Sequence, residues 1–409
     1  MQQGSMLIFP PRSFVGRGAA ARLAEEVRRY EAERVLLIAD PVLAKLGVTE
    51  RLAEPIRQGG ARLDVFAEIE PEPSLALAER LVAYTREGRY DLVVGLGGGS
   101  ALDLAKLAAV LSAHDGAVAD YLNLTGHRRI ERRGLPKLLV PTTSGTGSEV
   151  TNIAVLSLAQ TKDVVVHEYL SADAAIVDAE LTVSVPPRVT AATGIDAMTH
   201  AIEAYLSVHA SPTSDALALH AVRLAGRSIR RAVRDGSDIA AREDMSQASY
   251  IAGLAFFNAG VAGVHALAYP LGGQFHVPHG EANAALLPYV MARIAPACGG
   301  RMGDLLRALQ GDGADPAPAA AASAAEAAAG AEGAAGAGGA ADAFVAALHE
   351  LTRDVGLPAS LRDYGIGASH LDALTEDAGR QTRLLARSPL ALARADIHAI
   401  YTAAWQGRA

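Results

Sequence analysis

Two patterns of hydrophobic positions alternate along roughly the first 180 residues. Short, mainly apolar runs, which are typical of buried parallel strands, occupy residues 34–40, 61–69, 90–97, 137–143 and 174–180. Between several of them the apolar residues recur with the spacing of a helix, as in 74–88 and 101–114. Because strands that alternate with helices form parallel βαβ units, this part predicts an α/β domain with a parallel sheet.

The pattern changes at residues 182–194, and from there on nearly every segment has helical spacing. The pair Pro186-Pro187 lies at the change, so we expect an α/β domain over 1–184 and an all-α domain over 185–409. The segment at about 311–341 is almost entirely Ala and Gly. Since it has hardly any large side chain to bury, we interpret it as a low-complexity surface insertion without chemistry.

Composition narrows the class of protein. The 409 residues are 50% hydrophobic and 20% charged, and the net charge of -8 argues against a nucleic-acid partner. The one cysteine, Cys298, cannot form an intrachain disulfide and fits a reducing compartment. The N-terminus lacks the pattern of a signal peptide, and no apolar run reaches the roughly 18 residues of a membrane span. We therefore expect a cytoplasmic protein with no membrane association.

A glycine-rich turn follows the third apolar run, in "DLVVGLGGGSALDLAKL" (91–107). Gly97, Gly98 and Gly99 have no Cβ, so the backbone N–H groups at the start of the next helix can approach a phosphate. Ser100 and Asp103 have the spacing of an N-cap residue and its partner three positions later. The alternative is a tight turn that needs glycine for its backbone alone.

Asp40 ends the first apolar run and is a candidate for cofactor selection. Its carboxylate could accept hydrogen bonds from a ribose diol, which would favour NAD over NADP by repelling a 2′-phosphate. However, Asp40 precedes the glycines, so the usual dinucleotide fingerprint is not met. The alternative is an acidic residue that merely opens a loop before Pro41.

A second loop, "PTTSGTGSEVT" (141–151), follows the fourth apolar run. Its hydroxyl side chains, among them Thr142, Thr143 and Thr146, suit contacts to a diphosphate or a ribose. Clusters of Ser, Thr and Gly are also common in ordinary loops, and that alternative stays open here.

Candidate metal ligands lie in the second half of the chain. In "GIDAMTHAIEAYLS" (194–207), Asp196 and His200 are about 40° apart around a helix, and Glu203 falls on the same face. Such a pair alone is more often structural than metal-binding. Glu203 is either an outer partner of the site or a salt-bridge partner.

Three histidines, His265, His276 and His279, lie within 15 residues among apolar and small neighbours. With Asp196 and His200, His265 and His279 could supply one carboxylate and three imidazoles, a set that suits Fe²⁺ or Zn²⁺. The alternative is two unrelated patches of core histidines.

On these motifs the chain resembles the iron-containing (group III) alcohol dehydrogenase family. The resemblance covers nearly the whole chain except the Ala/Gly insertion, through "GGGSALD", "PTTSGTGSEVT", "AATGIDAMTHAIEAYLS", "AGLAFFNAGVAGVHALAYPLGG", "VPHGEANAALLPYVM", "TRLLARSP" and "IHAIYTAAW". It implies a Rossmann-like α/β domain with a parallel sheet, an all-α C-terminal domain (the dehydroquinate synthase-like fold) and a divalent metal in the cleft between them. It also implies a homodimer.

The resemblance assigns roles residue by residue. The metal ligands would be Asp196, His200, His265 and His279, and the diphosphate would be held by Gly97, Gly98, Gly99 and Ser100. Thr142, Thr143 and Thr146 would contact the cofactor further along, Lys162 the nicotinamide ribose, and Asp40 would favour NAD. The implied function is an NAD-dependent alcohol dehydrogenase or aldehyde reductase that uses Fe²⁺, or else Zn²⁺, and acts on a small alcohol or aldehyde.

The chain departs from the family pattern near the substrate. Tyr269 stands where relatives often have a histidine; with an ordinary pKa near 10 it is mainly a hydrogen-bond donor. His276 is a candidate to relay the proton instead, and Glu281 is either an outer partner of the metal site or an exposed residue.

Several other functions share the fold. They are a maleylacetate reductase-like enzyme, a hydroxyacid dehydrogenase, an enzyme of the dehydroquinate synthase type and a non-catalytic nucleotide-binding relative. The "PTTSGTGSEVT" loop favours the alcohol dehydrogenase branch. The scarcity of Lys and Arg in the motifs disfavours the dehydroquinate synthase type, whose substrate is an anion.

Overall fold

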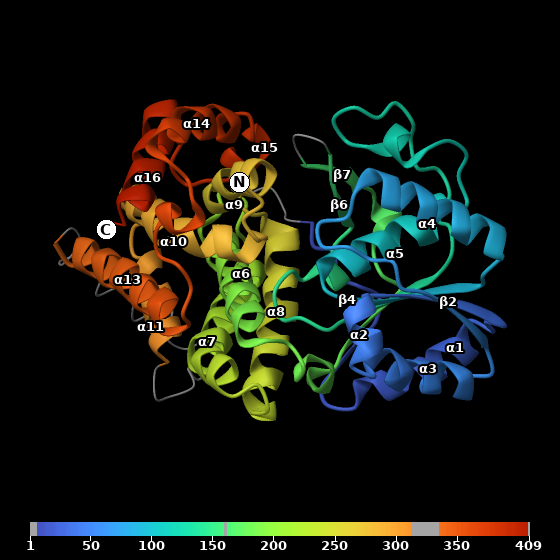
Figure 1. The fold of residues 1–409 in the computed structure, drawn as a ribbon. Helices are drawn as coiled ribbons and strands as arrows, with labels where there is room; N and C mark the ends of the chain where they lie inside the picture. The colour runs from blue at the N-terminus through green and yellow to red at the C-terminus, as the bar shows by residue number, and fades with distance from the viewer. Residues whose placement is uncertain (1–5, 159–161, 312–334, 408–409) are drawn as a thin grey trace.

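The computed structural model describes residues 6–158, 162–311 and 335–407, which form an α/β domain and a helical domain side by side (Figure 1). The predicted two-domain fold is confirmed. Most of the expected Ala/Gly insertion lies outside the described residues. Its last residues belong to α13 (Ala335–Asp354).

The α/β domain is built on a parallel sheet of six strands in the order β1-β8-β5-β4-β2-β3. The strands are β1 (Ser13–Val15), β2 (Arg34–Ala39), β3 (Arg62–Phe66), β4 (Leu92–Gly97), β5 (Lys137–Pro141) and β8 (Ala174–Val177). The five apolar runs correspond to β2, β3, β4, β5 and β8. Strand β1, at the sheet edge, has only three residues, too few to give a pattern.

Helices cover both faces of the sheet (Figure 1). Leu36 and Ile38 of β2 pack in one core with α4 (Leu75–Gly88) and α5 (Gly99–Leu111). Val35 and Leu37 pack in another core with α1 (Leu23–Arg29) and α3 (Val48–Gln58). Because successive side chains of a strand point to opposite faces, burial on both faces explains why β2, β4, β5 and β8 read as nearly unbroken apolar runs. The edge strand β3 is only partly buried.

An antiparallel hairpin, β6 (Ile153–Ser157) with β7 (Lys162–Val166), packs beside α5. Ala154, Leu156 and Val165 join the core of α4 and α5. Other residues of the hairpin, such as Lys162 and Val164, line the pocket described below.

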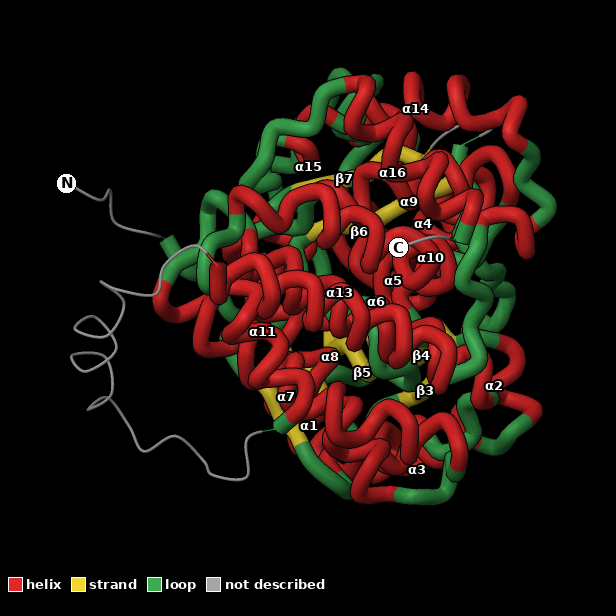
Figure 2. Tube along the Cα trace, turned by 90° about the vertical axis from the view of Figure 1, so that its left-hand side faces the viewer, coloured by secondary structure: helices red, strands yellow, loops and turns green. Residues whose placement is uncertain are grey.

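The helical domain begins with α6 (Pro187–Leu206), whose first residue is a proline, a favoured residue at the first helical position. Helix α6 is buried around most of its circumference because α7, α8 and α10 pack against it. Besides α13, the other α-helices of this domain are α7 (Pro212–Arg234), α8 (Ile239–Ala259), α9 (Gly263–Phe275), α10 (His279–Ile294), α11 (Arg301–Gln310), α14 (Leu371–Gly379), α15 (Thr382–Leu385) and α16 (Arg394–Gln406). Figure 2 views the molecule from the side of this domain. In the described part of the chain no single helix is long and apolar enough to cross a membrane; only α8 and α9 taken together, with a bend of 106° between them, pass that test by length and composition.

The sheet reverses its winding direction between β2 and β4. From β2 the chain moves outward to β3, returns past β2 to β4, and continues to β5 on the other side. In open α/β sheets, ligands bind beyond the carboxyl ends of the strands at such a reversal. Asp40 follows β2, and the glycine turn (97–99) begins at the last residue of β4, so the topology brings both candidates to one place.

Candidate metal and cofactor site

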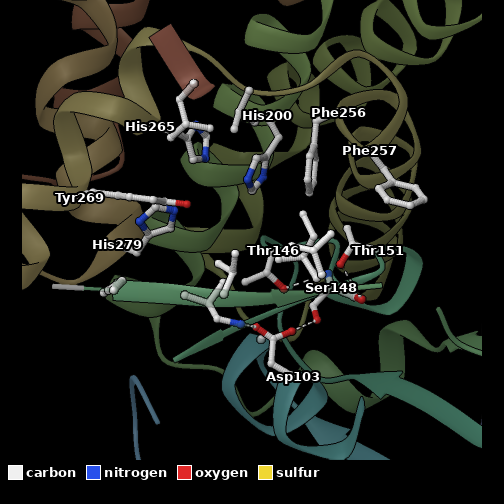
Figure 3. A pocket seen from close by; sticks show the side chains of 18 of the residues that line it. Asp103, Thr146, Ser148, Thr151, His200, Phe256, Phe257, His265, Tyr269 and His279 are labelled. Carbon is white, nitrogen blue, oxygen red and sulfur yellow. Dashed lines mark hydrogen bonds between the residues drawn. The ribbon is translucent and has the colours of Figure 1, made fainter. Parts of the chain in front are cut away.

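Four candidate metal ligands come together from three helices. Asp196 and His200 lie one turn apart on α6, His265 lies in the first turn of α9, and His279 is the first residue of α10. Figure 3 shows the three imidazoles at one end of a pocket between the domains. Residues more than 60 positions apart in sequence therefore meet because α9 and α10 pack against α6.

The donor atoms converge on the carboxylate. Oδ1 of Asp196 is 4.0 Å from Nε2 of His200 and 3.9 Å from Nε2 of His265. Nε2 of His279 is 3.7 Å from the same oxygen, and one donor atom each of Asp196, His265 and His279 lie within 4.8 Å of one another. A tetrahedral ion with ligand atoms at about 2.1 Å sets neighbouring ligand atoms about 3.4 Å apart. The donor set therefore has the chemistry and nearly the spacing that a divalent ion needs.

Outer partners orient two of the imidazoles. Nδ1 of His265 donates to Oε2 of Glu203 at 2.6 Å, and Nδ1 of His200 donates to the carbonyl of Gly145 at 3.2 Å. With Nδ1 protonated, Nε2 of each ring keeps a free lone pair toward Asp196. Glu203 also accepts hydrogen bonds from the backbone N–H of Val264 at 2.6 Å and of Ala262 at 3.0 Å. Glu203 is thus an outer partner of the site; the sequence alone had left open whether it was that or a salt-bridge partner.

Asn283 completes the cluster and was not found from the sequence. Its Nδ2 is 2.7 Å from Oδ1 of Asp196, 3.3 Å from Nε2 of His265 and 3.4 Å from Nε2 of His279. Oδ1 of Asn283 is buried and has no hydrogen-bond partner among the described residues. The signal was present, since Asn283 follows His279 by four positions and shares its face of α10.

The buried environment sets the protonation states. Burial would raise the pKa of Asp196, but the three surrounding imidazoles and Asn283 together hold it below its ordinary value. Burial lowers the pKa of His200 to about 4 and also lowers the pKa of His279. At neutral pH the carboxyl is therefore ionised and both rings are neutral, as a metal requires of its ligands.

Glu281, two residues after His279, does not reach this cluster. It is buried and accepts two hydrogen bonds from the guanidinium of Arg188, at 2.7 and 2.8 Å. Glu281 therefore forms an ion pair that joins α10 to the start of α6. It is neither an outer partner of the metal site nor an exposed residue, the two roles that the sequence had suggested.

The glycine turn forms the cofactor side of the pocket. Helix α5 begins at Gly99, its N-cap residue is Gly98, and no side chain caps its first N–H groups. A Cβ on Gly99 would lie 3.0 Å from Cγ2 of Thr146, so only glycine leaves the two loops this close. Uncapped N–H groups at the start of a long helix suit a diphosphate, and the residues present therefore fit a dinucleotide.

The expected capping pair of Ser100 and Asp103 does not form. Ser100 lies inside the first turn of α5, and its Oγ accepts a hydrogen bond from the backbone N–H of Glu72 at 3.3 Å. The helix starts two residues earlier than expected because Gly98, not Ser100, takes the N-cap position.

Asp103 instead belongs to a buried network around Lys106. The fully buried Nζ of Lys106 lies 3.0 Å from Oδ1 of Asp103, 2.7 Å from Oγ of Ser148 and 3.0 Å from Oγ1 of Thr151. Oγ of Ser148 donates to the same Asp103 oxygen at 2.5 Å (Figure 3). The network connects the helix that follows the glycine turn to the second loop and to the hairpin. The sequence did not predict it.

The threonines of the second loop lie against the glycine turn. Thr142 is buried, and its N–H donates to the carbonyl of Gly97 at 2.9 Å. Oγ1 of Thr143 would be 3.4 Å from a Cβ on Gly98. The loop is therefore placed to contact a ligand held at this turn, with Thr146 lining the pocket itself.

Asp40 lies beside Gly97 but does not line the pocket, whereas Lys162 does. Asp40 caps α2 (Pro41–Lys45) by accepting from the N–H of Val42 at 2.8 Å, and its Cβ would be 3.8 Å from a Cβ on Gly97. Lys162 lines the pocket, and its Nζ is 2.7 Å from Oε1 of Glu72.

Of the two candidates for moving the substrate proton, Tyr269 and His276, only Tyr269 lines the pocket. Tyr269 lines the pocket, with its ring centroid 6.1 Å from that of His279. His276 does not: it ends α9 in a left-handed conformation with φ of 53°, is exposed, and is not among the residues that line the pocket. Helix α9 ends at Phe275, so the side chain of His276 does not lie on the helix face that carries His265.

Comparison with known proteins agrees with this geometry. The family described as iron-containing alcohol dehydrogenase matches residues 10–179, and the C-terminal part of the Fe-containing alcohol dehydrogenase family matches residues 190–405. Long-chain-alcohol dehydrogenase 1 of Geobacillus thermodenitrificans is 58% identical over 98% of this chain and 97% of its own.

Two solved structures are similar over the whole fold. A 1,3-propanediol oxidoreductase has a TM-score of 0.88 at 32% identity, covering 98% of this chain and all of that one (100%). Sulfoacetaldehyde reductase from Bifidobacterium kashiwanohense, in complex with NAD+, has a TM-score of 0.84 at 28% identity, with 98% of each chain covered.

Proposed function

The chain belongs to the iron-containing alcohol dehydrogenase family, and from that premise we propose which of its residues do the work and on which substrates. It is an NAD-dependent oxidoreductase that acts on the CH–OH group of alcohols and on the corresponding aldehydes. Oxidation of an alcohol by NAD gives the aldehyde, NADH and a proton. The observation that carries the proposal is the convergence of one carboxylate and three imidazoles beside an uncapped helix start.

We propose that Asp196, His200, His265 and His279 hold the metal. When bound, the metal supplies a Lewis acid for the substrate oxygen, and the nicotinamide supplies or accepts the hydride. The rings of His200 and His265 keep their orientation through Gly145 and Glu203.

We propose that the glycine turn and the second loop hold the cofactor. Gly97, Gly98, Gly99 and Ser100 would receive the diphosphate, Thr142, Thr143 and Thr146 would lie along it, Lys162 would reach the nicotinamide ribose, and Asp40 would select NAD. The support is that Asp40 and the three threonines lie against the glycine turn, where the winding of the sheet reverses, and that Lys162 lines the pocket.

Tyr269 is proposed to donate a hydrogen bond to the substrate oxygen. Burial raises the pKa of Tyr269 above its ordinary value, so the phenol keeps its proton at neutral pH. This donor would stand in for the histidine that relatives often have there.

For the substrate we propose primary alcohols and aldehydes with long alkyl chains. The pocket, of ≈ 400 Å³, has apolar walls from Phe256, Phe257, Val261 and Leu384. The 58% identical relative is a long-chain-alcohol dehydrogenase. An apolar wall stabilises each added CH₂ group by about 0.8 kcal/mol, or roughly fourfold in kcat/KM.

The test is aldehyde reduction followed by NADH absorbance, with metal-loaded protein and unbranched aldehydes from ethanal to dodecanal. We expect kcat/KM to rise steeply with chain length, and Phe257→Ala to flatten that rise. Phe275→Ala, at a phenylalanine that does not line the pocket, is the matched control. A preference for ethanal would contradict the long-chain assignment, and no turnover of any aldehyde would contradict the dehydrogenase assignment itself.

We propose Fe²⁺ as the native metal, because three imidazoles with a carboxylate suit it and the family description names iron. The same donors accept Zn²⁺, so elemental analysis of protein purified without oxygen decides between the two. A homodimer and a cytoplasmic location are further proposals. The buried free thiol of Cys298 suits a reducing compartment, and sedimentation analysis tests the dimer.

A further inference from the structure

Two arginines of the segment "TRLLARSP" face the same pocket as the metal donors. Arg383 lies in α15, and Arg387 follows two residues after that helix ends. Both line the pocket that contains His200, His265 and Tyr269, and Arg383 also lines an adjoining cavity. The proposed reaction uses neither of them.

Other charged groups of the pocket already have partners. Asp103 is paired with Lys106 at 3.0 Å, and Glu72 with Lys162 at 2.7 Å. These pairs leave no net charge on the cofactor side of the cavity.

The two arginines have no such partner. Within the described residues, neither guanidinium lies within ion-pair distance of a carboxylate, whereas Arg380, one turn before Arg383, has Glu376 at 3.2 Å and Asp377 at 3.6 Å. Apart from the metal donors and Tyr269, the helical side of the pocket therefore carries two positive charges without carboxylate partners, beside the apolar walls of Phe256, Phe257, Val261 and Leu384.

The backbone holds Arg387 in this place. Its Nη1 donates to the carbonyl of Ala259 at 3.0 Å. Gly260, with φ of 90°, passes so close that a Cβ on it would lie 2.3 Å from Cδ of Arg387. Burial first, and then the charge of Arg383, lowers the pKa of Arg387. Two like charges thus face one pocket, and an anion bound beside both would relieve their repulsion.

We propose that Arg383 and Arg387 bind a carboxylate at the end of the substrate remote from the reacting carbon. This inference rests on the proposed function, and it narrows the substrates to ω-hydroxy acids and their ω-oxo acids. The reacting end would lie at the metal donors, the alkyl chain along Phe257, Val261 and Leu384, and the carboxylate at the arginines. The reaction itself is unchanged: the ω-oxo acid takes a hydride from NADH and a proton, and becomes the ω-hydroxy acid.

The experiment compares ω-oxo-octanoate with its methyl ester, which has the same chain but no charge. Metal-loaded protein with NADH gives kcat/KM for both aldehydes, and their ratio is the readout. We expect the wild type to favour the anion by about tenfold or more, and Arg383→Gln and Arg387→Gln each to lower the ratio by about tenfold. Arg380→Gln is the matched control, because it removes a neighbouring charge that has partners, and it should leave the ratio unchanged. Raising the salt to about 0.5 M should also lower the wild-type ratio.

The outcomes separate the inference from the proposed function. Equal rates for anion and ester in the wild type, or an unchanged ratio in both arginine variants, would overturn the carboxylate site while leaving the dehydrogenase intact. A higher KM for NADH with an unchanged ratio would place the arginines on the cofactor and also overturn it. If neither octanal nor the ester is reduced, the proposed function itself fails. Thermal melting of each variant confirms folding, and Arg383, being exposed, is the variant least able to disturb it.

Discussion

Replacing Glu203 with glutamine should weaken metal binding while leaving the helical domain folded. The carboxylate accepts three hydrogen bonds, from the backbone of Val264 and Ala262 and from Nδ1 of His265. Glutamine keeps the shape but loses the charge and offers only one acceptor oxygen. A hydrogen bond to a charged group contributes about 1.5–3 kcal/mol, and changes to outer partners cost about 10- to 100-fold in metal affinity. We expect a loss in that range.

The assay is competition between metal-free protein and a chromophoric chelator for Zn²⁺, with kcat/KM for aldehyde reduction measured on the same samples. Glu281→Gln is the control: Glu281 is equally buried and lies two residues from His279, yet it pairs with Arg188. That variant should lose stability but keep its metal affinity. Unaltered affinity in Glu203→Gln, or an equal loss in both variants, would refute the reasoning that Glu203 orients a ligand.

Three further predictions concern the cofactor side and pH. Asp40→Gly should raise kcat/KM with NADP by about tenfold or more and should cost only about 0.3 kcal/mol of stability through the lost side-chain cap of α2, since glycine is itself tolerated at an N-cap, as steady-state kinetics and thermal melting can show. Lys106→Met should leave Asp103 buried without its partner and destabilise the protein by about 3–5 kcal/mol in urea unfolding; a loss below about 1 kcal/mol would contradict the role of the network. Burial raises the pKa of Glu149 to about 7, so its contribution to stability is present below the pKa of the unfolded chain and falls as the pH rises through 7. Glu149→Gln should therefore raise the melting temperature relative to the wild type at about pH 8 and lose that advantage near pH 4.5; the same difference at both pH values would contradict the shift.

The parallel sheet was predictable because β2, β4, β5 and β8 are buried on both faces and read as nearly unbroken apolar runs. Strand β1 was not predictable because it has only three residues, and the β6–β7 hairpin was not because β6 is only half buried. The place of Asp40 was ambiguous in sequence because it precedes the glycine turn by many residues. The order of the strands, which no local pattern encodes, puts β2 beside β4 and so brings Asp40 to Gly97.

The four candidate ligands could be chosen from the sequence because histidines among apolar residues are unusual, but their outer partners could not. Asn283 and the carbonyl of Gly145 are ordinary residues until packing places them against the imidazoles. The unpaired charge of Arg383 and Arg387 is likewise a property of the fold, because it depends on which carboxylates lie nearby. His276 was selected on composition alone, and the end of α9 turns it away from the pocket.

The most direct test measures the metal content per chain and the NAD-linked oxidation of a long-chain alcohol in the same samples of wild type and Asp196→Asn. The account predicts one tightly held metal ion and turnover in the wild type. It predicts neither in the variant, which should still bind NADH in a fluorescence titration because the glycine turn is intact. Full metal occupancy and full activity in Asp196→Asn would contradict the assignment of the site.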